Sequence, residues 1–300
     1  MTSLPIALRA VPVAILLLLL SACTAPGAAS TASSSASPPT VSSTSTFTPS
    51  QRVLLFGEVH DNALQHAERL RTFEALLARG ARPALAMEQL DRERQGAIDA
   101  LFAGGARPTA DAVIAAGAPG GGQGGGWNWT FYRPFIQAAL NAGVPIVAAN
   151  VSRDEARRVM REGLAPLGFD AKVPADVLAA HTRDIVASHC GMIDAPMAAR
   201  MAQAQVARDQ FMARVLERHA ARGVVLLAGN GHVRTDIGAP RWLKPEVRAI
   251  SQAVGWLEAG DGGGLQPYDL VRMTPAQARP DPCEGMRKQV PAKPAAEATR

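Results

Sequence analysis

The stretch Val53-Leu54-Leu55-Phe56-Gly57-Glu58-Val59-His60 is a short apolar run that ends in glycine, glutamate and histidine. An apolar run of this length is typical of a buried strand. The Gly-x-x-His spelling returns 172 residues later, where the apolar residues 224–228 are followed by Gly229-Asn230-Gly231-His232. Both histidines are therefore expected where a buried strand gives way to a loop. Ligands bind at that edge in an open parallel sheet, so the repeat predicts a site.

Strand-like and helix-like segments alternate along the chain on both sides of this repeat. Strand patterns are expected at residues 53–59, 83–90, 144–151, 224–228, 247–254 and 268–273. Helical patterns are expected at residues 62–79, 91–103, 109–116, 130–142, 152–163, 174–187 and 195–221, and the glycine-rich residues 117–126 predict a mobile loop. Strands separated by helices predict an α/β fold, a single domain with a mostly parallel central sheet flanked by helices.

The N-terminus is typical of an exported protein. Residues 1–22 contain one Arg, an apolar run and then Leu20-Ser21-Ala22-Cys23, which predicts a signal peptide and resembles a bacterial lipobox with Cys23 as the lipidated residue. An ordinary signal peptide or a membrane anchor is the alternative, although the run is short for a span. Residues 24–50 carry no charge and are mostly Ser, Thr, Ala and Pro, so we expect a flexible tether.

These features predict four parts: a signal peptide at 1–22, a lipidated cysteine with its tether at 23–50, the α/β domain at 51–275 and a C-terminal tail at 276–300. The predicted location is the cell envelope, with a lipid anchor. Thr24 after Cys23 favours the outer membrane, by the sorting that bacterial lipoproteins resemble. A lipid anchor holds a domain on a membrane surface without spanning it.

Charge and cysteine content narrow the partners and the compartment. The formal net charge is +5, but Lys and Arg form no dense cluster, which excludes nucleic acid as an expected partner. Two cysteines, Cys190 and Cys283, remain when Cys23 is assigned to lipid. In an oxidising compartment we expect them to form a disulfide that ties the C-terminal tail to the domain. The alternative is two independent thiols.

Four residues at predicted strand ends are candidates for acid/base or metal chemistry. Glu58 and His60 share a face by strand alternation, and His232 belongs to the second Gly-x-x-His. Glu88 ends the second predicted strand, where a buried carboxylate is costly unless it is paired. Together these residues predict a site that holds a divalent cation such as Mn²⁺, Co²⁺ or Zn²⁺, or that activates water. The alternative is a set of charged strand ends bonded to the following helices.

Two further side chains are expected to point inward from helices. His66 begins an apolar stripe on the helix at 62–79, so it is predicted to lie near the strand ends, either as a satisfied core histidine or as part of the site. Arg208 interrupts an apolar stripe on the helix at 195–221. An inward Arg needs an anionic partner such as Asp209, Glu88 or a bound ligand, whereas the alternative is an Arg stem that only borders the stripe.

Aromatic residues are concentrated in residues 126–134, which hold two of the four Trp and one of the two Tyr. Beside a glycine-rich loop, this segment could form one wall of a pocket for a flat apolar ligand. The alternative is a cluster that anchors the loop to the core.

A series of motifs follows in fixed order along the chain. They are the lipobox at 20–23, Leu-Leu-Phe-Gly-Glu-Val-His at 54–60, Leu-Ala-Met-Glu at 85–88, Trp-x-x-x-x-Tyr-Arg-Pro at 127–134, Ile-Val-Ala-Ala-Asn-Val at 146–151, Ser-His-Cys-Gly-Met at 188–192, Ala-Gln-Val-Ala-Arg-Asp-Gln-Phe-Met-Ala at 204–213 and Leu-Leu-Ala-Gly-Asn-Gly-His at 226–232. Together they resemble the ChaN-type haem-binding lipoproteins of the Tiki superfamily, over most of residues 51–275.

This resemblance implies haem binding linked to iron acquisition, in a pocket completed by self-association as a homodimer. It makes His60 and His232 the shared histidines of the superfamily, with Glu58 and Glu88 as acidic companions. The superfamily also includes metal-dependent proteases and erythromycin esterase-like hydrolases. The predicted function is therefore that of a haem-binding uptake lipoprotein, with a metal-dependent hydrolase as the alternative. A third possibility is that the residues of the site now serve only as structural hydrogen-bonding groups.

Haem binding requires an iron ligand and a cation for the propionates. A tyrosinate or an imidazole can reach the iron, and Arg can pair with propionate. We expect Tyr132 to be the iron ligand and His189 the alternative, because Cys190 could fix its loop. Arg208 is the expected partner of a propionate.

Overall fold

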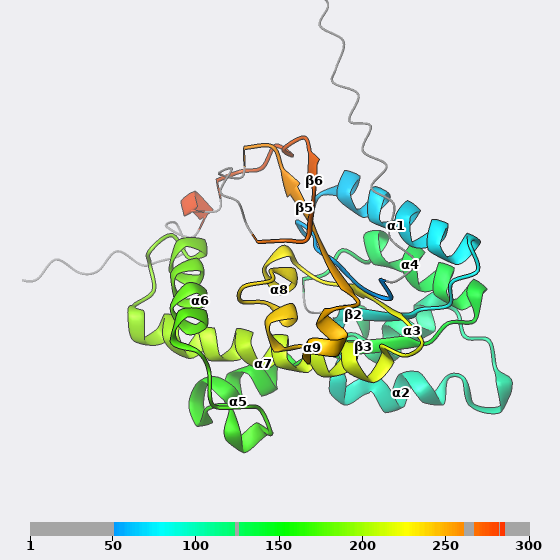
Figure 1. Cartoon of the computed structure of the whole chain (residues 1–300), viewed down its shortest axis with the longest axis horizontal. Helices are drawn as coiled ribbons and strands as arrows, with labels where there is room; N and C mark the ends of the chain where they lie inside the picture. Colours follow the sequence, from blue (N-terminus) through cyan, green and yellow to red (C-terminus); the bar gives the residue numbers. More distant parts are fainter. Residues whose placement is uncertain (1–50, 124–125, 261–266, 282, 286–300) are drawn as a thin grey trace, which may run out of the picture. The chain divides into compact units, whose positions relative to one another are not determined.

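The computed structural model describes residues 51–123, 126–260, 267–281 and 283–285. Its centre is one six-stranded sheet in the order β3-β2-β4-β1-β5-β6, in which every neighbouring pair is parallel (Figure 1). The strands are β1 Val53–Phe56, β2 Ala84–Asp91, β3 Ile146–Asn150, β4 Val224–Leu227, β5 Ser251–Glu258 and β6 Leu270–Thr274. The α/β fold with a parallel central sheet is therefore confirmed.

Side chains alternate across the two faces of the sheet and build two cores. Leu54 and Phe56 of β1 face the core formed with α1 Ala63–Ala78, α2 Gln95–Ala100, α3 Ala110–Gly117 and α4 Trp129–Ala142. Val53 and Leu55 face the opposite core, formed with α7 Ala195–His219 and α9 Pro245–Arg248. Figure 1 shows α1, α3 and α4 grouped apart from α7. This alternation is the two-residue period of a strand buried on both faces.

Two helices lie further from the sheet. Helix α5, Arg153–Glu162, and helix α6, Ala175–Ser188, contribute Val159 and Val177 to a third apolar cluster that includes Val206 of α7. They therefore pack on α7 rather than on the strands, and Figure 1 shows them at the outer edge of the molecule. Helix α6 reaches the carboxyl edge of the sheet from this side.

Local capping explains where the first helix starts. The side chain of Asn62 accepts a hydrogen bond of 3.0 Å from the backbone N–H of Gln65, as an N-cap residue does. Gly80, at φ +88°, follows the end of α1. Helix α1 lies within the predicted range 62–79, and its N-cap places Glu58 and His60 in the loop between β1 and α1.

Three predicted segments differ from the structure by more than the position of an end. The strand expected at 247–254 begins only at Ser251, because Pro245–Arg248 forms a helical turn, α9. The helix expected at 91–103 is a 3-10 turn followed by the short α2. In the glycine-rich segment predicted as a loop, residues 119–122 form a 3-10 turn in which Gly120, Gly121 and Gly122 have positive φ.

Several predictions concern residues outside the described parts of the chain. They are the signal peptide, Cys23 and the tether, which all precede residue 51. Within the described ranges, no helix is both long and apolar enough to cross a membrane.

Candidate functional site

The two Gly-x-x-His segments meet because their strands are neighbours. Strand β1 pairs with β4 so that Phe56 lies opposite Leu227. Beyond this pair, the backbone N–H of Asn230 donates a 3.0 Å hydrogen bond to the carbonyl of Glu58. The second segment then enters α8, Asn230–Val233, which carries His232. The prediction that both histidines lie at the carboxyl edge of the sheet is confirmed.

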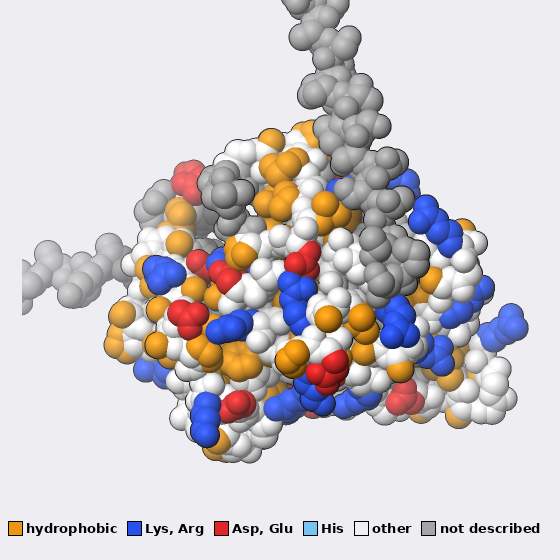
Figure 2. Space-filling view, viewed as in Figure 1, with side chains coloured by type: hydrophobic (Ala, Val, Ile, Leu, Met, Phe, Trp, Pro, Cys, Tyr) orange, Lys and Arg blue, Asp and Glu red, His pale blue; other side chains and the backbone are white. Residues whose placement is uncertain are grey.

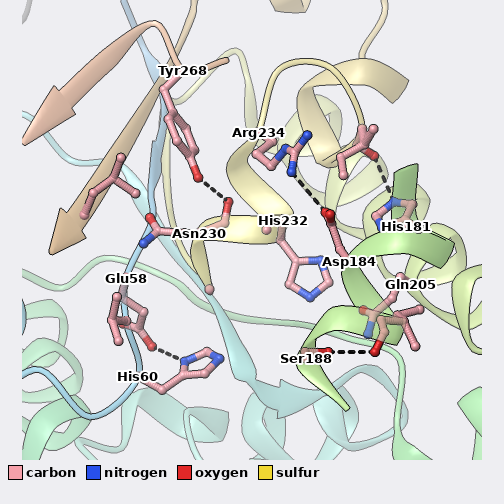
Figure 3. Close-up of a pocket in the computed structure, with 16 residues that line it drawn as sticks. Glu58, His60, His181, Asp184, Ser188, Gln205, Asn230, His232, Arg234 and Tyr268 are labelled. Atoms are coloured by element: carbon pink, nitrogen blue, oxygen red, sulfur yellow. Dashed lines mark hydrogen bonds and ion pairs between the residues drawn. The ribbon is translucent and has the colours of Figure 1, made fainter. Parts of the chain in front are cut away.

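A cavity of about 620 Å³ lies at this edge (Figure 3). One side is formed by the loop after β1, by the end of β5 and by α8, and the other side by α6. Its polar lining includes His60, His181, Asp184, His232, Arg234 and Tyr268. Apolar side chains from both sides, among them Ile185 and Leu257, complete it. A concave, partly apolar site with a few converging polar groups is typical of a small-molecule pocket.

Glu58 forms the inner part of the site, and its side chain is completely buried. Its Oε1 accepts hydrogen bonds from the Tyr132 hydroxyl at 2.5 Å and from Nδ1 of His60 at 2.8 Å. Its Oε2 forms an ion pair with Arg69. The bond to Nδ1 leaves Nε2 of the half-exposed His60 ring available to a ligand. The predicted Glu58–His60 pair is therefore present.

Arg69 provides the positive charge that compensates Glu58. It lies fully buried on α1, where Nη2 donates to the carbonyl of Phe56 at 3.3 Å and the guanidinium lies 5.7 Å from the ring centre of Phe135. Burial lowers the pKa of Arg69 to about 9, so the group is still charged at neutral pH. A buried carboxylate needs such a partner, because desolvating an unpaired charge is costly.

His66 lies behind the site rather than in it. The ring is buried and stacks on Phe131, with 4.4 Å between ring centres, and Nε2 donates to the carbonyl of His60 at 3.0 Å. Burial lowers the pKa of His66, which favours the neutral ring. The inward orientation expected from the apolar stripe is confirmed, and the contacts make His66 a support for the His60 loop.

His232 is held between two carboxylates. Its Nδ1 donates to Oδ1 of Asp209 at 2.6 Å, and its Nε2 lies 3.6 Å from Oε1 of Glu88. The second oxygen of Glu88 accepts from the backbone N–H of Gly229 at 2.8 Å. Burial disfavours the charged ring, but Asp209 and Glu88 outweigh it and raise the pKa of His232. Burial likewise opposes ionisation of Glu88, yet His232, His60 and the Gly229 N–H lower its pKa.

Asp209 is a site residue that the sequence did not reveal. It is fully buried on α7, and its Oδ2 lies 3.3 Å from Nε2 of His181. One carboxylate thus contacts two imidazoles that both line the cavity. The apolar stripe of α7 is interrupted at Arg208, one residue before Asp209, so the sequence pattern indicated the neighbouring position.

Gly229 lies between the two halves of the site. A Cβ atom at this position would lie 3.0 Å from both Cε1 and Nε2 of His60. That is closer than real Cβ contacts commonly allow, so glycine permits the His60 ring to lie against the second segment.

The four residues predicted to share a metal ion are divided between two hydrogen-bonded groups. Glu58 faces His60, Tyr132 and Arg69, whereas Glu88 faces His232 and Gly229. Throughout the described ranges, no group of three or more His, Cys, Asp or Glu side chains is arranged to hold a metal ion. The geometry gives the predicted metal centre no support, because Glu58 is already paired with Arg69 and the two carboxylates face different partners.

The residues predicted to bind haem lie outside the cavity lining. Tyr132 is completely buried, and burial raises its pKa. His189 follows α6, and its Nδ1 donates to the carbonyl of Ile185 at 2.8 Å. Arg208 is half-buried and donates to Gln205 at 3.4 Å, and the ion pairs of the described residues do not include it. In this conformation Tyr132 acts as a hydrogen-bond donor to Glu58, not as a group that faces a ligand.

Sequence reasoning missed four polar side chains of the cavity wall, which are His181, Asp184, Arg234 and Tyr268. Tyr268 lies just before β6, and its hydroxyl donates to the carbonyl of Asn230 at 3.3 Å. Its ring lies against Gly255 of β5, where a Cβ atom would approach the ring to within 2.8 Å. Arg234 follows α8 and pairs with Asp184 at 3.0 Å (Figure 3) and with Asp236 at 2.7 Å. The one sequence signal for Tyr268 is that the chain contains just two tyrosines.

The aromatic segment packs around the Glu58 side of the site. The ring centres of Trp127 and Trp129 lie 5.7 and 6.0 Å from that of Tyr132, and Trp127 lies 4.8 Å from His60. These edge contacts favour the interpretation that the segment anchors a loop against the core.

The sequence and the fold place the chain in a known family. The model of the haem-binding uptake family, Tiki superfamily, ChaN, matches residues 48–243, so the chain belongs to this family. The family expected from the ordered motifs is thereby confirmed. None of the curated protein sequences matches this chain.

One solved structure shows the same fold. The structure of ChaN of Campylobacter jejuni, described as showing cofacial haem binding, is similar with a TM-score of 0.60 and 22% identity, covering 74% of this chain and 87% of that one. The type III effector HopBA1 is similar with a TM-score of 0.42 and 13% identity, covering 75% of this chain and 88% of that one. The erythromycin esterase EreC is similar with a TM-score of 0.38 and 10% identity, covering 73% of this chain and 74% of that one. The first likeness shows the shared fold, and the two weaker ones carry no argument.

Proposed function

We propose that this protein binds haem in the cavity at the carboxyl edge of the sheet and serves haem or iron uptake. The family membership carries the proposal, together with the position of the cavity beside both Gly-x-x-His segments. Haem needs apolar contact for its ring, a ligand for its iron and cations or donors for its propionates. The cavity offers each of these from described residues.

The residues that would hold the iron are Tyr268 and His60. Tyr268 presents a phenol in the cavity wall, and His60 presents an exposed imidazole whose other nitrogen is fixed by Glu58. A tyrosinate and a histidine are both established iron ligands in haem proteins. Bound haem would supply the iron as cargo, while the protein supplies the ligand and excludes water from one face.

Arg234 is the group suited to a propionate. Arg234 is held in the wall by Asp184 and Asp236, so its position is fixed before a ligand arrives. Charge-assisted hydrogen bonds to carboxylates are stronger than neutral ones.

Haem titration of the full chain tests this proposal. We expect a saturable Soret band in the wild-type protein, a shifted or weakened band in Tyr268→Phe or His60→Gln, and an unchanged band in Tyr132→Phe. Tyr132→Phe is the matched control, because it removes the only other tyrosine hydroxyl of the chain. A wild-type protein without saturable haem binding would overturn the proposal.

We further propose that the domain is anchored to the outer membrane through Cys23 and that haem is held between two copies. Sequence features before residue 51 support the anchor. The exposed Val271 and Met273 on the edge strand β6 offer apolar surface for self-association. Mass spectrometry of Cys23, compared with Cys23→Ala, tests the anchor. Light scattering with and without haem tests the dimer.

A further inference from the structure

The chain after β6 connects opposite sides of the cavity. We call residues 275–281 and 283–285 the strap. It leaves β6 at Thr274 beside the end of β5, and it ends next to α6, whose last turn lines the other side of the cavity. Figure 1 shows this orange-to-red segment passing from the β6 side toward the end of α6.

Arg279 attaches the strap to the sheet side. Its guanidinium donates to both oxygens of Asp61, at 2.6 and 2.7 Å, and to both oxygens of Glu258, at 2.6 and 2.7 Å. Glu258 also accepts a 2.5 Å hydrogen bond from Asn62, the N-cap of α1. The Arg279 hydrogen bonds, with that of Asn62, lower the pKa of Glu258 to about 2. Two bidentate pairs on one guanidinium fix its position.

Cys283 attaches the strap to the α6 side. It forms a disulfide with Cys190, which follows the last turn of α6. The backbone N–H of Cys283 donates to Oδ1 of Asp281 at 2.8 Å, which turns the strap toward Cys190. The disulfide expected from the cysteine count is confirmed.

Both attachments adjoin cavity-lining residues. On the sheet side, Asp61 follows His60 and Glu258 follows Leu257, and on the other side Cys190 lies two residues after Ser188. Arg279 and Cys283 are four residues apart, so their Cα atoms can be separated by at most about 14 Å. The strap is therefore a tether of fixed length between the two sides of the cavity.

We propose that the strap sets the width of the cavity and that the Cys190–Cys283 disulfide makes this width redox-sensitive. The inference rests on the proposed haem site. A dithiol transfers two electrons and two protons to the disulfide, which gives two protein thiols and a cyclic disulfide of the reductant. The freed tail then no longer ties α6 to the sheet side, so α6 moves outward and haem is released more readily.

Haem titration of oxidised full-length protein tests the strap through two variants. We expect Cys190→Ser/Cys283→Ser and Arg279→Gln to raise the dissociation constant for ferric haem about tenfold or more, because each frees one attachment. Arg158→Gln is the matched control, since it breaks an exposed Arg–Glu pair on α5, far along the chain from the strap. If either strap variant binds haem as the wild-type protein does, the inference is overturned.

Dithiothreitol provides the redox arm of the test. It is expected to weaken haem binding by wild-type protein to the level of the double serine variant, and to leave that variant unchanged. A reductant effect on the double variant would show a direct action on haem and would overturn the redox assignment.

Amide hydrogen exchange without haem separates the strap from the haem proposal. We expect faster exchange in the last turn of α6 after reduction or in the double serine variant. Unchanged exchange would overturn the strap whatever the haem result. If the oxidised wild-type protein binds no haem, the proposed function fails, and the exchange experiment still decides on the strap.

Discussion

The Tyr132 hydroxyl donates a hydrogen bond of 2.5 Å to Oε1 of Glu58. The same oxygen also accepts a hydrogen bond from Nδ1 of His60. One carboxylate oxygen therefore connects a buried tyrosine to the exposed histidine of the site. Tyr132 itself does not line the cavity, and the rings of Trp127 and Trp129 pack against it.

Replacement of Tyr132 by Phe is expected to lower the free energy of unfolding by about 1–3 kcal/mol, because a buried carboxylate loses a donor. Urea unfolding measures this change. The haem spectrum should stay as in the wild-type protein. Loss of the Soret band with unchanged stability would instead make Tyr132 a direct ligand.

Removal of the Arg69 charge tests the buried ion pair. Arg69→Met should cost about 3–5 kcal/mol of unfolding free energy, since it leaves Glu58 buried without its cation. The double variant Arg69→Met/Glu58→Gln should recover part of this loss, because the uncompensated charge is gone. A double variant no more stable than the single one would contradict this pairing.

The stability of the apo protein should depend on pH through His232. The pKa of His232 is raised in the folded state. Burial and the charge of Arg208 lower this pKa, but the carboxylates of Asp209 and Glu88 raise it by more. A raised pKa contributes stability that is fully present below about pH 6.5, the unfolded value, and is lost as pH rises through the folded pKa.

Asp209→Asn is expected to flatten this dependence, because it removes the carboxylate at Nδ1 of His232. Thermal unfolding between pH 5.5 and 9, compared for the two proteins, measures the difference. Parallel curves over this range would assign the titration to another group. His181→Asn is the companion variant, since His181 is the other imidazole that faces Asp209.

The repeat offers its own matched pair of glycine variants. Gly229→Ala should displace the His60 ring and weaken haem binding, because the added Cβ would meet the ring at 3.0 Å. Gly231→Ala is the matched control for stability and should unfold as the wild-type protein does, since a Cβ at that position meets no atom within 4 Å. Overpacking of this kind costs about 1–3 kcal/mol where the neighbour cannot move. A Gly229→Ala protein that binds haem with the wild-type affinity would show that His60 does not contact the ligand.

Sequence patterns located the first half of the site well. Glu58, His60 and His232 follow apolar runs, and parallel strands bring such ends to one edge. The stripe on α7 identified the correct helix but favoured Arg208, whereas Asp209 is the buried neighbour. Successive helical residues are about 100° apart and a buried helix face spans at least that angle, so the residue next to an interruption can be the buried one.

The other half of the site depends on long-range contacts. Tyr268 and Arg234 enter the cavity wall only because β5, β6 and α8 pack together, and no local pattern records this packing. The strand order was also hidden, because hydrophobic runs identify buried strands without naming their neighbours. The partners of Glu58 and Glu88 were hidden for the same reason, since they come from α1, α4, α8 and the backbone of Gly229.

The strand order also has a consequence for biogenesis. Strand β4 lies between β1 and β2, although it follows both by more than a hundred residues in the sequence. The two early strands, β1 and β2, therefore do not pair with each other. The centre of the sheet can therefore close only after residue 227 is available. Such non-local pairing makes folding slow. Contact between the two Gly-x-x-His segments is thus a late event in the maturation of this chain, and any product truncated before β4 lacks the site entirely.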